Sequence, residues 1–252
     1  MISDRALWAT WYNLPAGGRD AYLAWLHGSY IPKLLEHPGI VSAAHYACEK
    51  ITIPPRIRHT EDPAVPRGND YILIFGGKSS HAFSKGTQAF ASHAPSKLDA
   101  NLTAEDRTML ALRSDVRVSI FTEEARIDGP EAKQRVGETA LSPCIQFGSF
   151  NGGSSEADDE LLAWYADWRM PALAKLPGCV GMRKLVSVSG WAQHGVIYEF
   201  VSLEARNKYI PTLAASYPEM EAWTNAFIPK LTHAFGSPHV AQRIWPAINT
   251  GK

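Results

Sequence analysis

A helix-forming segment near the start of the sequence carries two side chains that could act together as an acid and a base. His27 and Tyr30 are three residues apart within residues 19–37, so an α-helix would place them on one face. An imidazole titrates near neutral pH, which suits proton transfer. We expect His27 and Tyr30 to be catalytic; the alternative for His27 is a partly exposed histidine with no chemical role.

A second helix-forming segment, residues 160–176, carries Arg169 on a face that it shares with apolar residues such as Leu162. A guanidinium on such a face needs a partner, because burying an unpaired charge is costly. We expect Arg169 to bind a substrate carboxylate through two parallel hydrogen bonds. The alternative is a structural ion pair with Asp167 or Glu199.

Four further candidates lie in segments with the apolar patterns of strands. Glu199 interrupts an apolar run where the first half has Ile74, and it would serve as a general acid or base if apolar neighbours raise its pKa. Otherwise it faces solvent or the interface between the halves. His45 is either catalytic or structural, and Lys184 either binds substrate or extends to solvent. His239 is a further catalytic candidate at the start of the last strand.

Residues 52–69 form a proline-rich insert in the first half, at a place where the second half has only a short turn. Arg58 and His59 give this insert charge, and we expect both to bind substrate. Long loops of this kind tend to be lids, binding loops or assembly arms. The sequence leaves two alternatives open, a lid over a site or an arm that contacts a second subunit.

No pattern in the sequence indicates a metal or a nucleotide cofactor. The histidines include no pair with HxxxH or HxH spacing, and Cys48, Cys144 and Cys179 are far apart. The glycine-rich phosphate-binding motifs and the GxSxG motif of serine hydrolases are absent from the sequence. We therefore expect no metal and no cofactor, and three reduced cysteines.

The segments that hold these residues occur twice along the chain in the same order. Pro32 and Pro38 are as far apart as Pro171 and Pro177, and a glycine follows the second proline of each pair. The expected strands are residues 6–14, 40–49, 70–77 and 114–123 in the first half and 144–150, 179–189, 195–203 and 239–245 in the second. The expected helical segments are residues 19–37, 81–93, 160–176 and 204–235.

Each half therefore has the order β-α-β-β-α-β, which is the ferredoxin-like arrangement. We expect an α+β protein with a first repeat at residues 1–125, a linker at 126–142 and a second repeat at 143–252. Helices cover one face of each sheet and leave the other face bare. Two tandem ferredoxin-like repeats on one chain can join their bare faces into an intramolecular α/β barrel.

The composition is that of a globular protein, with 45% hydrophobic and 20% charged residues. Twenty-five Lys and Arg balance 25 Asp and Glu, so no net charge directs the chain to nucleic acid or a membrane surface. No stretch has the roughly 20 apolar residues of a transmembrane helix, and the first residues lack a signal-peptide pattern. We expect a cytoplasmic monomer or homodimer whose partner is a small-molecule substrate, with no nucleic-acid or membrane partner.

The first strand, a helix that ends in Pro-x-Leu and then Pro-Gly, and the following strand resemble the EthD-like branch of the dimeric α/β-barrel superfamily. The resemblance is clearest over residues 6–50 and 144–190. Two residues before the helix proline, where that pattern commonly has histidine, this chain has Tyr30 and Arg169. The superfamily includes muconolactone-type isomerases, cofactor-free monooxygenases of small aromatic substrates, and haem proteins of the chlorite-dismutase type. The resemblance implies a pocket between a sheet and its helices.

The candidate residues and the resemblance together favour a cofactor-independent catabolic enzyme. It would be an isomerase, lyase or hydrolase that acts by acid/base chemistry on a small organic acid, such as an aromatic ring-cleavage product. One alternative is a cofactor-free monooxygenase or haem-binding protein of the same superfamily, with His233 as the candidate haem ligand. Another alternative is a non-catalytic small-molecule binding or stress-response module.

Overall fold

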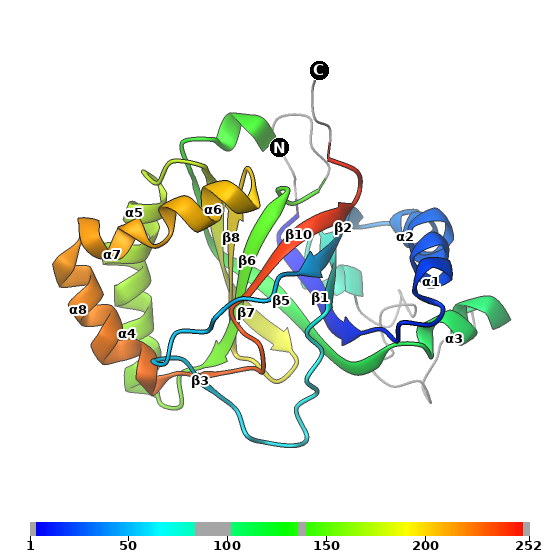
Figure 1. Cartoon of the computed structure of the whole chain (residues 1–252), viewed down its shortest axis with the longest axis horizontal. Coiled ribbons are helices and arrows are strands. Elements are labelled where there is room, and N and C mark those ends of the chain that lie inside the picture. The colour runs from blue at the N-terminus through cyan, green and yellow to red at the C-terminus, as the bar shows by residue number, and fades with distance from the viewer. Residues whose placement is uncertain (1–3, 84–101, 136–139, 249–252) are drawn as a thin grey trace.

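Eight antiparallel strands form a closed barrel at the centre of the molecule, and helices cover it on two opposite sides (Figure 1). The computed structural model describes residues 4–83, 102–135 and 140–248. The barrel strands are β1 (Ala6–Asn13), β2 (Ile40–Cys48), β4 (Tyr71–Gly77), β5 (Ser114–Asp128), β6 (Cys144–Asn151), β7 (Cys179–Ser189), β8 (His194–Phe200) and β10 (His239–Trp245). Two short strands, β3 (Arg58–His59) and β9 (Thr232–His233), extend the sheet beside β6.

The strand order repeats in the two halves, which confirms the expected pair of ferredoxin-like repeats and the α+β class. The first half has the order β2-β4-β1-β5 and the second half β7-β8-β6-β10. The last strand of each half pairs with the second strand of the other, β5 with β7 and β10 with β2. Each repeat therefore supplies the hydrogen-bonding partners for both open edges of the other, and no barrel strand is left at an edge.

The long helix of each half has a π-helical turn in its middle. This turn covers Leu26–Tyr30 in the first half and Tyr165–Arg169 in the second, and a helix proline follows each turn. The helices are α1 (Arg19–Trp25), α2 (Ile31–Leu35), α3 (Ala104–Leu110), α4 (Ser155–Trp164), α5 (Met170–Leu173), α6 (Leu203–Tyr209), α7 (Thr212–Ser216) and α8 (Pro218–Phe227). None of the described helices is long and apolar enough to cross a membrane.

The π-helical turn corrects one expectation about the second helix. Leu162 was expected on the inner face with Arg169, but its side chain is 43% exposed, and Leu161 is buried in its place. A π-helical turn holds more residues than an α-helical turn, so it shifts the phase of the residues before it relative to those after it. Extrapolation backwards from Arg169 with the α-helical period therefore selects the wrong leucine.

Two other helical expectations differ from the structure. The segment expected at residues 81–93 begins with a 3-10 turn, Ser80–Phe83, and residues 84–93 lie outside the described part of the chain. The segment expected at residues 204–235 is divided into α6, α7 and α8. Pro211 and Pro218 stand at the divisions, because proline lacks the N–H that an interior helical position requires.

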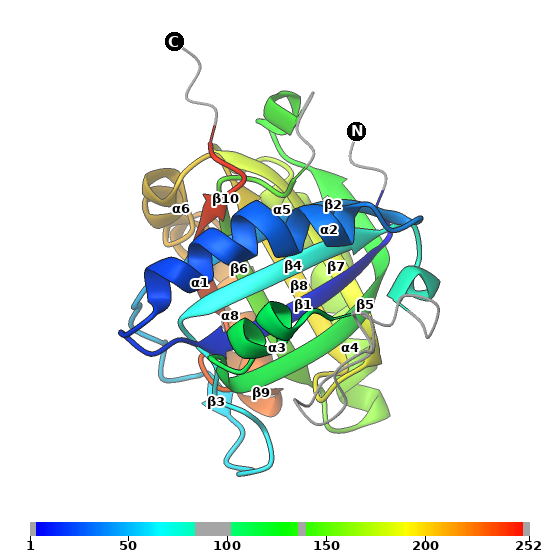
Figure 2. The same ribbon diagram turned by 90° about the vertical axis from the view of Figure 1, so that its right-hand side faces the viewer.

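The side chains of each strand alternate between the barrel interior and the layer under the helices. Trp11, Phe121 and Phe147 point inward and pack together, with ring centroids 4.9 Å apart for Trp11–Phe147 and 5.9 Å for Phe121–Phe147. Outward-facing side chains form one core under α1–α3 and another under α4–α8. Figure 2 shows α1 and α2 lying across the strands of the first half.

A network of buried charges closes one end of the barrel interior. Arg183 donates to Asp4 Oδ1 at 2.9 Å and to Glu199 Oε1 at 3.3 Å, and Arg135 donates to the same Glu199 oxygen at 3.1 Å. The Ser142 hydroxyl and backbone N–H donate to Glu199 Oε2 at 3.0 and 3.1 Å. Burial acts to raise the pKa of Glu199, but Arg183 and Arg135 hold it below its ordinary value.

We expect Arg183→Met to lower the free energy of unfolding by about 3–5 kcal/mol, because Asp4 and Glu199 would remain buried with less compensation. Arg5→Met is the matched control: its side chain is 69% exposed and ion-pairs with Glu123 at 2.6 Å. The control should change the stability by less than about 1 kcal/mol. Urea unfolding followed by tryptophan fluorescence measures both, and equal effects would contradict a specific role of the network.

Candidate functional site

A cavity of about 530 Å³ lies between the outer face of the second-half sheet and its helices. Its floor is formed by β6 and β8 and its walls by α4, α8 and the adjoining turns. Thr52, Pro54, Arg56 and Ile57 of the insert in the first half also form part of its lining. The volume falls in the range of sites for small organic molecules.

Smaller side chains on β6 explain why the cavity lies in the second half. Asn13 and Asn151 end equivalent strands, and each accepts a hydrogen bond from the backbone N–H of the facing hairpin, at 2.7 and 2.6 Å. Counting back from these asparagines, Gly148 of the cavity floor corresponds to Thr10 and Gln146 corresponds to the buried Trp8. In the first half, the indole of Trp8 fills the space that remains open in the second half.

Arg169 lines the cavity and has no carboxylate partner in the described part of the chain. Its Nε donates to the Tyr198 hydroxyl at 3.1 Å, and its guanidinium carbon lies 5.1 Å from the Tyr198 ring centroid and 5.6 Å from that of Trp164. Neither of the expected alternatives, an ion pair with Asp167 or with Glu199, is formed. The guanidinium is held by aromatic groups and keeps its charge facing the cavity.

A second guanidinium, that of Arg206 on α6, also lines the cavity. Its Nε and Nη2 donate to Gln146 Oε1 at 3.0 and 2.7 Å, and its Nη1 donates to Asn207 Oδ1 at 2.9 Å. Burial lowers the pKa of Arg206, and the nearby charge of Arg169 lowers it further. All of its hydrogen-bond partners are neutral amides, so Arg169 and Arg206 bring to the cavity two positive charges that form no ion pair with a described carboxylate. The carboxylate of the lining, Glu221, pairs with Arg56 instead.

Aromatic rings make up much of the remaining wall. Phe150, Trp164, Tyr165 and Tyr198 all line the cavity. The Trp164 Nε1 donates to the Thr224 hydroxyl at 3.2 Å, which fixes the indole against α8. Burial, followed by the neighbouring Tyr198, raises the pKa of Tyr165 well above its usual value, so Tyr165 stays protonated near neutral pH. The cavity is therefore both aromatic and cationic.

His233 on β9 is the histidine of the cavity lining. Burial, followed by the nearby His59, lowers its pKa to about 4, so the imidazole is neutral at pH 7. Its Nδ1 is buried and makes no hydrogen bond to any described residue. A neutral imidazole with a free nitrogen can act as a ligand or as a weak base.

The insert is fastened to the second half beside the cavity. Arg56 donates to Glu221 Oε1 at 2.5 Å and to Asn225 Oδ1 at 2.7 Å, both on α8. The two expected substrate-binding residues of the insert lie outside the cavity lining. Arg58 is exposed and donates to Thr232 Oγ1 at 2.9 Å, and His59 Nε2 lies 2.8 Å from the Ser237 carbonyl oxygen.

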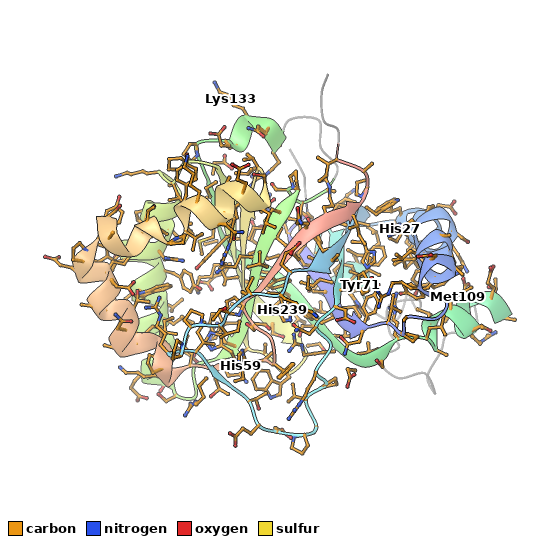
Figure 3. The ribbon with its side chains drawn as sticks, viewed as in Figure 1. His27, His59, Tyr71, Met109, Lys133 and His239 are labelled. Atoms are coloured by element: carbon orange, nitrogen blue, oxygen red, sulfur yellow. The ribbon has the colours of Figure 1, made fainter. Side chains whose placement is uncertain are left out.

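The structure joins His27 and His45, but in the first half and away from the cavity. His27 Nε2 lies 2.8 Å from His45 Nδ1, and His45 Nε2 lies 2.8 Å from the Tyr12 hydroxyl. Burial lowers the pKa of both histidines, and that of the fully buried His45 more strongly. Tyr30 is also buried, 4.8 Å from Trp25 between ring centroids. Figure 3 shows His27 and Tyr71 on the side of the first-half helices.

Lys184 corresponds to His45 in the strand pairing, since His45 faces Leu73 and Lys184 faces Val196. It is buried under the second-half helices, ion-pairs with Glu124 and lies 5.8 Å from the Tyr165 ring centroid. Lys184 itself is not part of the cavity lining. Its ammonium is thus held beside the cavity wall rather than inside the cavity.

Glu199 and His239 point into the barrel interior, and neither lines the cavity. Glu199 belongs to the charge network described above. The first-half residue that corresponds to Glu199 is Gly76, not Ile74 as expected. Glu199 pairs with Ile145, and Leu7, the equivalent of Ile145, pairs with Gly76. Alignment of the two apolar runs by composition alone placed the strands out of register.

Tyr198 and Arg206 are among the cavity residues that the sequence analysis missed. Strand alternation was a usable signal for Tyr198, because the neighbour of an inward-facing Glu199 must face outward. No local signal marks Arg206, whose position depends on how α6 packs on β6. Among the described residues, no group of three His, Cys, Asp or Glu side chains is placed to hold a metal ion.

We expect the stability to fall as the pH is lowered below about 6.5, the ordinary pKa of histidine. The folded state keeps His45 neutral, whereas the unfolded chain protonates it near pH 6.5. This contribution is complete above pH 6.5 and is lost as the pH falls toward the lower folded pKa. His45→Gln should therefore reduce the slope of melting temperature between pH 7.5 and 5, and the exposed control His81→Gln should not. Equal slopes in both variants would contradict a neutral His45.

No protein-family model and no curated protein matches this chain. Solved structures match it over most of its length. A proposed monooxygenase from Fusobacterium nucleatum is 9% identical, with a TM-score of 0.56 and coverage of 96% of this chain and 94% of that one. An anthrone oxidase-like protein is 11% identical, with a TM-score of 0.55 and coverage of 97% and 94%. A proposed chlorite dismutase is 12% identical, with a TM-score of 0.50 and coverage of 95% and 94%.

At these identities the likeness shows the fold and leaves the chemistry open. The eight-stranded antiparallel barrel of this chain, formed by two ferredoxin-like halves, is the fold that the sequence pattern predicted. The chain has the dimeric α/β-barrel fold, in the tandem form in which both halves lie on one polypeptide.

Proposed function

We propose that the cavity binds a small planar aromatic anion and that the protein oxygenates it without a bound cofactor. One observation carries this proposal: Arg169 and Arg206 line an aromatic cavity, and neither is paired with a carboxylate among the described residues. A positive charge in a partly enclosed site is stabilised by an anionic ligand. Phenolates and aromatic carboxylates combine that charge with a flat apolar surface.

The walls favour an aromatic ligand over an aliphatic one. Trp164 and Tyr165 are fixed by packing, with ring centroids 4.8 Å apart in an edge-to-face arrangement. Aromatic rings stack on such walls with a gain beyond the area that they bury. Thr52 and Pro54 of the insert line the same cavity, so we assign the insert the role of a lid.

The charges suit a reaction that passes through a phenolate. Guanidinium groups near the ring oxygen lower the pKa of a bound phenol, and the resulting phenolate is electron-rich enough to react directly with O₂. A substrate that carries a ring CH₂ group supplies the electrons itself: the CH₂ becomes C=O, one oxygen atom enters the product and the other leaves as water. His233, neutral at pH 7, is the group of the lining that could accept a proton.

The structural comparisons support oxygenation more than the other reactions. A proposed monooxygenase and an anthrone oxidase-like protein share this fold, whereas no comparison supports an isomerase, lyase or hydrolase. Membership of the EthD-like branch is likewise a proposal, which rests on the Pro-x-Leu and Pro-Gly pattern of the two long helices.

We expect anthrone to be oxidised with uptake of one O₂ per molecule, and Arg169→Met to lower kcat/KM about 10- to 100-fold. That range corresponds to the loss of one charge-assisted hydrogen bond of about 1.5–3 kcal/mol. An oxygen electrode measures the uptake, and the absorbance of the product gives the stoichiometry. The matched control is Arg67→Met, which removes an exposed arginine outside the cavity lining.

A binding measurement tests the proposed class of ligand independently of the proposed reaction. Isothermal titration with 2-naphthoate and with its neutral amide, 2-naphthamide, tests whether the cavity prefers an anion of the same shape. Tighter binding of the acid, with the preference lost in Arg169→Met, supports the cationic site even if anthrone is not a substrate. Equal binding of acid and amide, or no binding of either, would overturn the proposal.

Haem binding is the second candidate, because His233 lines the cavity with a free nitrogen. In this candidate His233 would hold the iron, and Arg169 and Arg206 would pair with the carboxylates of the porphyrin. Bound haem would supply redox chemistry at the iron. Titration with haemin followed by absorption tests this candidate: a Soret band that shifts on binding and is lost in His233→Ala supports it, and free-haemin spectra throughout reject it.

A further inference from the structure

Four buried polar side chains without hydrogen-bond partners gather at one end of the barrel interior, separate from the outer cavity. They are Trp11 on β1, Arg117 on β5, Ser149 on β6 and His239 on β10, each no more than 3% exposed. The Trp11 Nε1, all three guanidinium nitrogens of Arg117, the Ser149 hydroxyl and both ring nitrogens of His239 make no hydrogen bond to any described residue. Buried polar groups in proteins are nearly always paired, so this group requires an explanation.

The strand pairing brings these side chains together. Trp11 and Arg117 are directly opposite in the β1–β5 pair, and the Arg117 guanidinium carbon lies 4.6 Å from the Trp11 ring centroid. The Trp11 ring lies 6.1 Å from the His239 ring across the barrel. The Ser149 backbone N–H donates to the Ser237 hydroxyl at 2.9 Å, which places Ser149 at the start of β10 as well. Figure 3 shows His239 within the barrel, between the two helical layers.

Arg117 carries a charge that nothing in the described structure balances. Burial lowers its pKa to about 10, so it is protonated at pH 7, and no described carboxylate forms an ion pair with it. The nearby Asp115 is exposed and accepts a hydrogen bond from Asn13 instead. The charge network at the other end of the barrel, in contrast, pairs both of its arginines, Arg135 and Arg183, with a carboxylate.

Loops pack closely over this end of the barrel interior. At Gly68, a Cβ atom would lie 2.7 Å from the Trp11 carbonyl oxygen. At Gly236, where φ is +74°, a Cβ atom would lie 2.1 Å from Asn69 Oδ1 and 2.9 Å from His239 Nε2. The Phe147 carbonyl is near enough to His239 to raise its pKa, but burial and the Arg117 charge keep this histidine neutral. As a neutral imidazole it has a single N–H, which can be donated either to the Phe147 carbonyl or to a ligand.

We propose that this end of the barrel interior binds a small monovalent anion, held by the guanidinium of Arg117 and by N–H and O–H groups of Trp11, Ser149 and His239. The available groups are a cation and donors, and the only acceptors among them are the hydroxyl oxygen and one imidazole nitrogen. A halide, nitrate or formate ion matches this set in charge and size. The site is independent of the proposed function, since none of its four residues lines the outer cavity.

The first test measures the melting temperature of the full chain at constant ionic strength, with sodium gluconate replaced stepwise by chloride, bromide, nitrate or formate. Constant ionic strength keeps the general screening of charges constant. Gluconate serves as the reference anion because it is too large for a closed interior. We expect at least one small anion to raise the melting temperature by about 5–10 °C, with saturation. Arg117→Met should abolish the rise, and the exposed control Arg5→Met should keep it. No saturable rise with any of the four anions would overturn the proposal.

The second test covers the case in which Arg117→Met does not fold. Crystals of the unmodified chain soaked in sodium bromide should show an anomalous peak within hydrogen-bond distance of the Arg117 guanidinium. The same crystals soaked in nitrate or formate should show matching planar density there. A guanidinium that contacts only ordered water or backbone carbonyl oxygens under all these conditions would overturn the proposal.

Discussion

Closure of the eight-stranded barrel is the constraint on which the rest of the molecule depends. Because β5 pairs with β7 and β10 with β2, the hydrogen bonds that complete each repeat come from the other repeat. This pairing turns one face of every strand into a shared interior and the other toward helices. Each candidate residue on a barrel strand therefore lies in one of two environments, a closed lumen or a layer under helices. Sequence neighbours such as Tyr198 and Glu199 fall on opposite sides.

The duplicated halves have diverged most in the layer under the helices. The first half packs Trp8 and Tyr30 there, together with the His27–His45–Tyr12 chain of hydrogen bonds. The second half has smaller residues at the matching strand positions and arginine at the matching helix position, so a cavity with two cationic groups remains open. The first repeat still contributes to this cavity through its insert. In the proposed function, one repeat serves as scaffold and lid, and the other holds the site.

Buried charges are compensated differently at the two ends of the barrel lumen. At one end, Asp4 and Glu199 pair with Arg183 and Arg135, so desolvation is offset by close ion pairs. At the other end Arg117 lies over the face of Trp11, which compensates less than a carboxylate does, and it forms no ion pair with a described carboxylate. The unpaired guanidinium buried there is the basis of the proposed anion site. In this fold, a buried charged side chain indicates a ligand site mainly where it has no ion-pair partner.

The sequence by itself predicted the duplication, the β-α-β-β-α-β order and the closed barrel, because the apolar periods and the paired prolines are local patterns that recur in the same order in both halves. It also identified Arg169 as a residue on the inner helix face. Only the tertiary structure decided which half contains the cavity. That depends on the sizes of the equivalent side chains Trp8 and Gln146 and on the packing of α6 and the insert. It also separated Glu199 and His239 from Arg169, because strand register, which a shift of one residue inverts, determines which side chains enter the lumen.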